Sequence, residues 1–154
     1  MELHAVVETS RRVAATAARG VKIELLAGLL GRCPPASVDA AVGVLAGVPR
    51  QGKIGIGYAS LRAARAAPPA AAPTLTLADL DATLDRLIGT HGTGAGAERA
   101  RMLHELFARA TADEQDFLAR LLLGELRQGA LEGLMVERRS PKPPRCRSAT
   151  SGAR

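Results

Sequence analysis

Residues 45–59 have the most distinctive chemistry in this sequence. The segment LAGVPRQGKIGIGYA places four glycines, a proline, an arginine and a lysine between two Ala- and Leu-rich segments. Glycine lets the backbone come close to another surface, and proline ends the preceding helix. Arg50 and Lys53 add positive charge to this bare backbone. A chain of phosphates is a natural partner for such a turn.

A second segment, GELRQG at 124–129, repeats the Arg-Gln-Gly triplet at the end of another expected helix. Two such turns predict two contact points on one extended anion. The alternative for the second turn is a helix C-cap, with Gly129 as terminator and Arg127 near the negative end of the helix dipole. Both interpretations can hold together. The alternative for the first turn is a plain interhelical loop whose glycines relieve crowding.

The net charge of +6 is unevenly distributed along the chain. Residues 1–137 hold 15 basic and 15 acidic side chains, and residues 138–154 hold six basic and no acidic ones. Residues 1–70 have 9 basic and 4 acidic side chains, against 6 and 11 in residues 71–137. The first turn lies in the basic half. For a polyanionic partner, such polarity matters more than the overall charge.

The length of 154 residues favours one domain, and a hydrophobic content of 47% with 2% aromatics predicts an aliphatic core between closely packed helices. No apolar run could span a bilayer and no signal pattern opens the chain, so we expect a soluble cytoplasmic protein without membrane contact. Cys33 and Cys146 do not form a disulfide framework, and His4, His91 and His104 lie far apart. We predict no metal site and no catalytic residues.

Apolar periodicity predicts an all-α fold, a compact multi-helix domain. The first helix is expected over 2–18 with a break at Gly20, and the second over 21–31. The Pro- and Ala-rich connector at 67–73 cannot be regular helix. It joins two expected helical halves, 1–66 and 76–137.

Two helix starts have a complete capping box. Thr76 is followed by Asp79, and Thr111 by Glu114, each three residues on. The acidic residues around Glu114 could suggest paired catalytic carboxylates. Because they lie in the first turn of a helix, we interpret them as capping residues.

The segments VLAGVPRQGKIGIGYASL (44–61) and TADEQDFLARLLLGELRQGALEGLM (111–135) resemble the N-terminal DNA-binding domain of ATP-dependent DNA ligases. The resemblance covers about residues 1–136, and Tyr58 stands where many relatives have tryptophan. It implies an all-helical domain that holds nicked double-stranded DNA across the minor groove, through turns between helices. The DNA-binding residues that it implies are Arg50, Gln51, Gly52, Lys53 and Gly55 in one turn, and Arg127, Gln128 and Gly129 in the other.

Ligases of this family take AMP from ATP with the lysine of a K-x-D-G motif. Lys22, Lys53 and Lys142 are followed by IEL, IGI and PPR, so none fits. We expect a ligase fragment that lacks the adenylation domain, holds no cofactor and seals no nick alone; ATP and Mg belong to the full-length family. Its partners would be nicked DNA and the missing catalytic domains, in DNA repair, replication and recombination. The alternative is a helical protein–protein interaction or scaffold domain without DNA contact.

The sequence changes character after Glu137. Residues 138–154, RRSPKPPRCRSATSGAR, are basic and Pro-containing, and we predict a disordered tail. The ligase family continues with helix here. We therefore expect that the chain is a ligase truncated or frameshifted after about residue 137.

Overall fold

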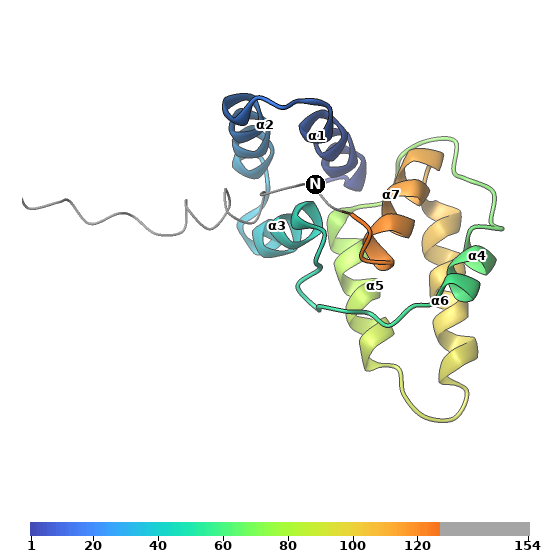
Figure 1. The fold of residues 1–154 in the computed structure, drawn as a ribbon. Helices are drawn as coiled ribbons and strands as arrows, with labels where there is room; N and C mark the ends of the chain where they lie inside the picture. The colour runs from blue at the N-terminus through green and yellow to red at the C-terminus, as the bar shows by residue number, and fades with distance from the viewer. Residues whose placement is uncertain (127–154) are drawn as a thin grey trace, which may run out of the picture.

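The computed structural model describes residues 1–126, in which every regular element is a helix (Figure 1). A 3-10 helix, η1 (Pro35–Ser37), precedes α3, and one isolated antiparallel bridge joins Glu2 to Thr76. The all-α prediction is confirmed. The predicted tail at 138–154 lies outside the described residues. The α-helices are α1 (Leu3–Ala15), α2 (Arg19–Gly31), α3 (Val38–Ala46), α4 (Tyr58–Ala64), α5 (Leu77–Gly89), α6 (Ala95–Arg109) and α7 (Ala112–Leu122).

The predicted boundary between the first two helices is wrong. The break lies at 16–18, and Gly20 belongs to the first turn of α2. Thr16 has extended backbone, and its hydroxyl accepts a hydrogen bond from the Ala18 amide at 3.2 Å. Such a local side-chain bond offers the backbone an alternative to helix. It ends α1 before the glycine is reached.

Both predicted capping boxes are present. The Asp79 amide donates to the Thr76 hydroxyl and the Thr76 amide to the Asp79 carboxylate, each at 3.1 Å. At α7, the Thr111 amide donates to the Glu114 carboxylate at 2.8 Å, and the Glu114 amide to the Thr111 hydroxyl at 3.4 Å. The hydrogen bonds with Thr76 lower the pKa of Asp79 below its ordinary value. Two helix starts are therefore fixed by local chemistry.

The first residues of the chain are joined to the start of α5. The Leu3 amide donates to the Leu75 carbonyl at 2.9 Å, and the Leu77 amide donates to the Met1 carbonyl at 3.0 Å. The side chains of Leu3, Leu75 and Leu77 are all at most 1% exposed. This junction ties α1 to α5, which follows it by about half the length of the chain.

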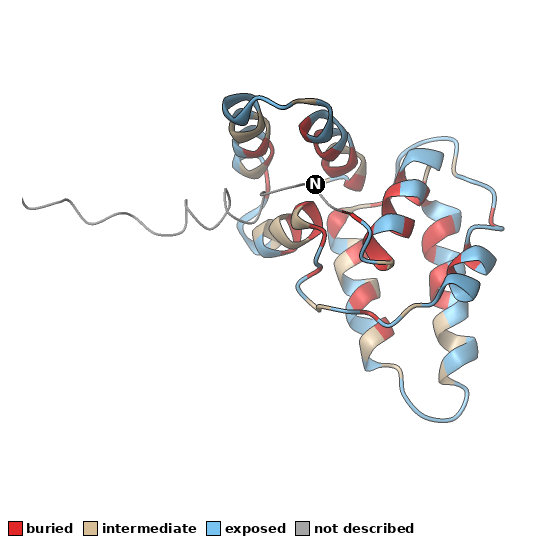
Figure 2. Ribbon diagram, in the orientation of Figure 1, coloured by how far each residue is buried: buried red, intermediate tan, exposed pale blue. Residues whose placement is uncertain are grey.

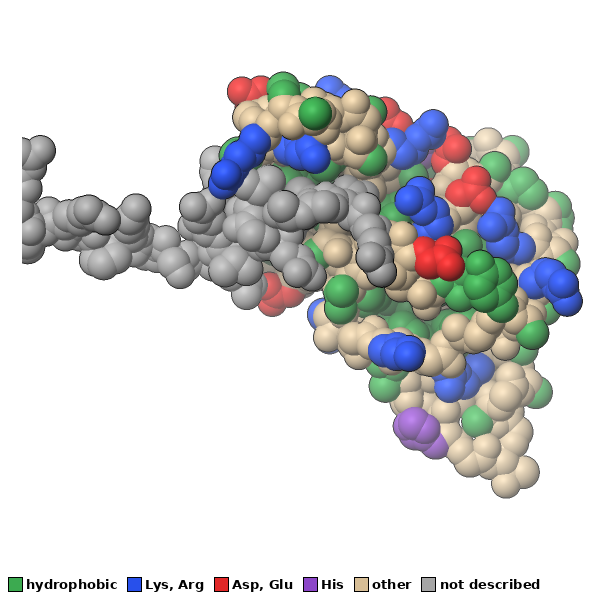
Figure 3. Space-filling model, viewed as in Figure 1, with side chains coloured by type: hydrophobic (Ala, Val, Ile, Leu, Met, Phe, Trp, Pro, Cys, Tyr) green, Lys and Arg blue, Asp and Glu red, His purple; other side chains and the backbone are tan. Residues whose placement is uncertain are grey.

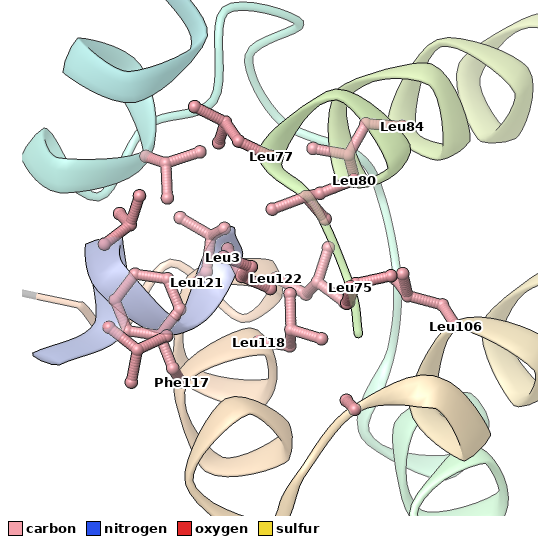
Figure 4. Close-up of a cluster of buried hydrophobic side chains, with 14 of the residues drawn as sticks. Leu3, Leu75, Leu77, Leu80, Leu84, Leu106, Phe117, Leu118, Leu121 and Leu122 are labelled. Atoms are coloured by element: carbon pink, nitrogen blue, oxygen red, sulfur yellow. The ribbon is translucent and has the colours of Figure 1, made fainter. Parts of the chain in front are cut away.

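One apolar core connects helices from both predicted halves. Leucines and a phenylalanine from α1, α5, α6 and α7 meet in it, as Figure 4 shows. In Figure 2 the buried residues line the inner faces of the helices. α1 packs against α2, α3, α5 and α7, while α6 packs against α4 and α5. The core is almost entirely aliphatic, as the composition predicts.

The Pro- and Ala-rich connector is irregular, as predicted, and a buried glutamine holds it in place. The Gln115 side-chain amide donates to the carbonyls of Ala67 at 3.2 Å and Phe107 at 2.8 Å. The Ala70 amide donates to the Ala110 carbonyl at 2.9 Å. These bonds attach the connector to the corner between α6 and α7.

Candidate nucleic-acid interface

The first Arg-Gln-Gly turn begins where α3 ends. Gly47 has a φ of 82°, the Gly47 amide donates to the Val44 carbonyl, and the Val48 amide donates to the Gly43 carbonyl. This is the Schellman arrangement, in which a left-handed glycine satisfies the last carbonyls of a helix. A Cβ at Gly43 would lie 2.8 Å from the Val48 carbonyl oxygen and 3.1 Å from the Arg50 amide nitrogen. The absence of a side chain at Gly43 therefore lets the turn fold back onto α3.

The glycines of the turn itself meet open space. Gly52 and Gly55 have φ values of 75° and 70°, which residues with a side chain rarely adopt. No other described residue lies within 4 Å of a Cβ built at either position. Relief of crowding within residues 1–126 is thus not the reason for these two glycines. No side chain covers the backbone at either position, and the Gly52 amide donates to the Pro49 carbonyl at 2.8 Å.

Arg50 and Gln51 hold the turn against α5. The Arg50 guanidinium donates to both carboxylate oxygens of Asp81, with 2.7 Å from Nε to Oδ1 and from Nη2 to Oδ2, and it also pairs with Asp85. The Gln51 side-chain amide donates to the carboxylates of Asp81 at 2.8 Å and Asp85 at 2.9 Å. Bidentate arginine–carboxylate pairs fix geometry as well as charge. We call these four side chains the α5 clasp.

The α5 clasp changes the ionisation of its members. Partial burial raises the pKa of Asp81, but the hydrogen bonds from Arg50 and Gln51 outweigh this effect and bring the pKa below its ordinary value. The same hydrogen bond raises the pKa of Arg50. Because Arg50 faces two carboxylates, the clasp has no positive charge to offer a polyanion. Arg50 and Gln51 remain predicted DNA contacts, and in this structure both are engaged with α5.

The other side of the turn is fastened to α6. The Arg99 guanidinium donates to the Ile54 carbonyl at 2.7 Å, and the Ile54 side chain is 6% exposed. Lys53 lies between these two attachments, is exposed, and has no ion pair among residues 1–126. Of the five residues predicted in this turn, Gly52, Lys53 and Gly55 form the free outer surface.

The second turn begins after α7 in the same way as the first turn begins after α3. Gly124 has a φ of 71°, its amide donates to the Leu121 carbonyl, and the Glu125 amide donates to the Arg120 carbonyl at 2.8 Å. Gly124 therefore ends α7 as Gly47 ends α3. In both segments the Arg-Gln-Gly triplet starts three residues after this glycine. The predicted contact residues Arg127, Gln128 and Gly129 lie outside the described residues.

The chain that enters the second turn touches the start of the first. A Cβ at Gly47 would lie 2.1 Å from the Leu126 carbonyl oxygen. Leu126 is buried and belongs to the same core as Ile54. Two segments far apart in the sequence thus lie side by side at this point.

Sequence reasoning did not find Asp81, Asp85 and Arg99. The two aspartates lie four residues apart on α5, beside its leucine stripe, a pattern that suggests the edge of an ordinary solvated face. Nothing local indicates that their partner is an arginine 31 residues earlier. The missed residues are those that position the turn.

The acidic residues at the start of α7 have separate partners. Glu114 closes the capping box, Asp113 pairs with Arg11 at 2.9 Å, and Asp116 pairs with Arg65. The capping interpretation is confirmed for Glu114. Among residues 1–126, no three His, Cys, Asp or Glu side chains gather as a metal ion would require. Within the same range, no helix is long and apolar enough to cross a membrane.

Comparison with known proteins shows which family has such a sequence. Residues 19–138, which include both Arg-Gln-Gly turns, match the family described as DNA ligase N terminus. The chain belongs to this family. The resemblance to the N-terminal domain of DNA ligases, which the two turn segments indicate, is therefore confirmed.

Bacterial relatives extend the match of this ligase N-terminal domain to nearly the whole chain. A probable DNA ligase of Anaeromyxobacter sp. (strain Fw109-5) is 54% identical over 138 residues, covering 89% of this chain and 27% of the relative. A probable DNA ligase of Pseudarthrobacter chlorophenolicus is 51% identical over 137 residues, covering 89% and 27%. One of Rhodococcus jostii (strain RHA1) is 49% identical over 132 residues, covering 86% and 26%. The chain thus spans about a quarter of the length of these curated relatives.

Proposed function

We propose that this chain binds double-stranded DNA without sequence preference, through the turn at 49–57. In a complete ligase it would hold nicked duplex while the catalytic domains seal it, in DNA repair, replication and recombination at the nucleoid. Membership of the DNA ligase N-terminal family supports the link to ligation. The probable DNA ligases that it resembles are about four times longer than the matched region, which supports assigning the sealing step to other domains.

The observation that carries the proposal is the outer surface of the turn. Gly52 and Gly55 put no side chain over the backbone, and Lys53 adds between them a positive charge that has no ion pair among residues 1–126. Backbone amides and lysine side chains contact phosphate oxygens, and such contacts carry no information about the bases. Hydrogen bonds to α5 and α6 attach the turn on both sides of this surface. A ligase has to accept any sequence, and this chemistry does so.

The test is binding of the full chain to nicked duplex across a salt series, measured by filter binding. We expect Lys53→Ala to weaken binding by about tenfold at low salt, because one charged contact is lost. The slope of log K against log salt should fall by about 1. Two duplexes of unrelated sequence should be affected equally.

The matched control is Arg86→Ala, which removes one exposed charge from α5. Arg86 is not one of the side chains that attach the turn to this helix. It should leave the salt slope unchanged. Equal effects of the two substitutions would contradict the proposed role of the turn. Absence of salt-dependent binding by the unaltered chain would contradict DNA binding itself and favour the helical scaffold alternative.

Charge reversal tests both turns at once. Arg50→Glu combined with Arg127→Glu should weaken binding far more than Arg86→Glu does. At position 50 part of the effect comes from displacement of the turn. A carboxylate there would be repelled by Asp81 and Asp85, and this repulsion would release the turn from α5.

We also propose that the chain alone takes no AMP from ATP and needs no cofactor, because none of its three lysines stands in a K-x-D-G motif. Incubation with labelled ATP should leave the protein unlabelled. A covalently labelled band would contradict this.

A further inference from the structure

A second positively charged surface adjoins the turn. An open groove of about 480 Å³ lies between α4 and the C-terminal half of α7. Its floor is apolar and its walls carry arginines from both helices. The groove is lined chiefly by Leu61, Arg62, Arg65, Ala119, Arg120 and Leu123.

Two of the three arginines have no ion-pair partner in the described part of the chain. Arg62 and Arg120 are exposed, and neither forms an ion pair within residues 1–126. Arg65 pairs with Asp116, which lies outside the groove lining. The remaining acidic residue at the groove is Glu125, to which the Tyr58 hydroxyl donates at 3.4 Å. The groove therefore keeps a positive balance.

The groove lies next to both Arg-Gln-Gly segments. Tyr58 lines the groove, follows directly after the first turn and is 71% exposed. Glu125, beside it, stands two residues before Arg127. Figure 3 shows Lys and Arg side chains over α4, α7 and the turn on this one face. The groove therefore begins at the residue that follows the first turn.

We propose that this groove binds the sugar–phosphate backbone of one DNA strand and lengthens the contact made by the turn. The proposal rests on the proposed function. Guanidinium groups match phosphate oxygens in planar, two-pronged geometry and are weakly hydrated, so unpaired arginines favour phosphate. The uncharged deoxyribose between phosphates suits the apolar floor of Leu61, Ala119 and Leu123.

The experiment compares the double variant R62A/R120A with R12A/R32A in the full chain. Arg12 and Arg32 are also exposed and line a smaller groove of about 270 Å³ between α1 and α2, so the control removes the same charge elsewhere. Circular dichroism and urea unfolding check that both variants fold. Filter binding to duplex across a salt series and hydroxyl-radical footprinting provide the readouts.

We expect R62A/R120A to lower the magnitude of the salt slope by about 2, one for each lost phosphate contact, and to weaken binding by at least about tenfold. The footprint on one strand should become shorter. The R12A/R32A variant should keep the slope and the footprint of the unaltered chain.

Three results would overturn the proposal. If R62A/R120A matches R12A/R32A while Lys53→Ala still weakens binding, the groove is not a DNA site and the proposed function stands. If the unaltered chain does not bind DNA, both proposals fail together. If R62A/R120A loses binding to a polyglutamate peptide but keeps its DNA slope and footprint, the groove serves an acidic protein instead.

Discussion

At the scale of single residues, glycines decide how closely the two turn segments approach. Gly47 combines a left-handed backbone with a direct contact to the Leu126 carbonyl, whereas Gly52 has only the left-handed backbone. The two positions therefore have different physical requirements. The distinction separates the cost of backbone conformation from the cost of a blocked contact.

We expect Gly47→Ala to lower the free energy of unfolding by at least about 3 kcal/mol, because it adds a backbone clash to the cost of positive φ. Gly52→Ala should cost only about 1 kcal/mol, since its Cβ would meet open space. Urea unfolding of the two variants measures both values. Equal losses would show that Leu126 does not lie against Gly47 in solution.

The α5 clasp gives stability that depends on pH. The pKa of Asp81 is lower in the folded chain than its ordinary value, so its pairing with Arg50 stabilises the fold above the ordinary pKa of aspartate. This contribution is lost as pH falls through the lowered pKa of the folded chain. Its size is modest because both side chains are partly exposed.

We therefore expect Asp81→Asn to be less stable than the unaltered chain at neutral pH, with the difference shrinking as pH falls below about 4. Urea unfolding at a series of pH values gives the difference directly. Asp113→Asn is the control, because it removes a carboxylate outside the α5 clasp, whose partner Arg11 lies on α1. A constant difference for Asp81→Asn over the whole range would contradict the role of this ion pair.

At the scale of helices, local signals were enough to predict where several elements begin. The boxes at Thr76 and Thr111 depend on side chains three residues apart, and the leucine stripe of α5 repeats with helical spacing. The end of α1 was missed because the Thr16 hydroxyl acts before the more conspicuous Gly20. Contacts between distant elements, such as Arg50 with Asp81, leave no periodic or local trace in the sequence.

The connector between α4 and α5 depends on one side chain from α7. Gln115→Ala removes both hydrogen bonds that this side chain donates. The Ala67 carbonyl then has no donor among the described residues, and the Phe107 carbonyl keeps only the Ala110 amide at 3.2 Å. We expect a loss of about 3 kcal/mol in the free energy of unfolding.

The comparison for this prediction is Thr111→Ala, which removes the cap of the same helix and should cost about 1 kcal/mol. Thermal or urea unfolding decides between them. A smaller loss for Gln115→Ala than for Thr111→Ala would mean that the connector does not need this attachment.

At the scale of the whole molecule, α1 joins the two helical halves that we predict from the sequence. The predicted halves, 1–66 and 76–137, are separated by a real irregular connector. In the described residues, however, α1 and α3 pack against α5, and α1 also packs against α7. The composition predicted an aliphatic helical core, but which helices share it depends on tertiary packing that no local pattern records.

We expect Leu3→Ala to destabilise the entire described part by about 3 kcal/mol, because Leu3 is fully buried where α1 meets α5 and α7. Hydrogen exchange should show the slowest amides of α1 and α6 losing the same protection. Val21→Ala, at an exposed position on α2, is the control and should change little. Loss of protection confined to α1–α3 would instead show that the two halves unfold independently.

The exposed ring at the mouth of the α4–α7 groove also has a practical use. Tyr58 is the single tyrosine of the chain, which contains no tryptophan. All intrinsic tyrosine emission under ultraviolet excitation therefore originates from this one site. Occupancy of the groove can be followed as quenching in the unlabelled protein, without any added dye.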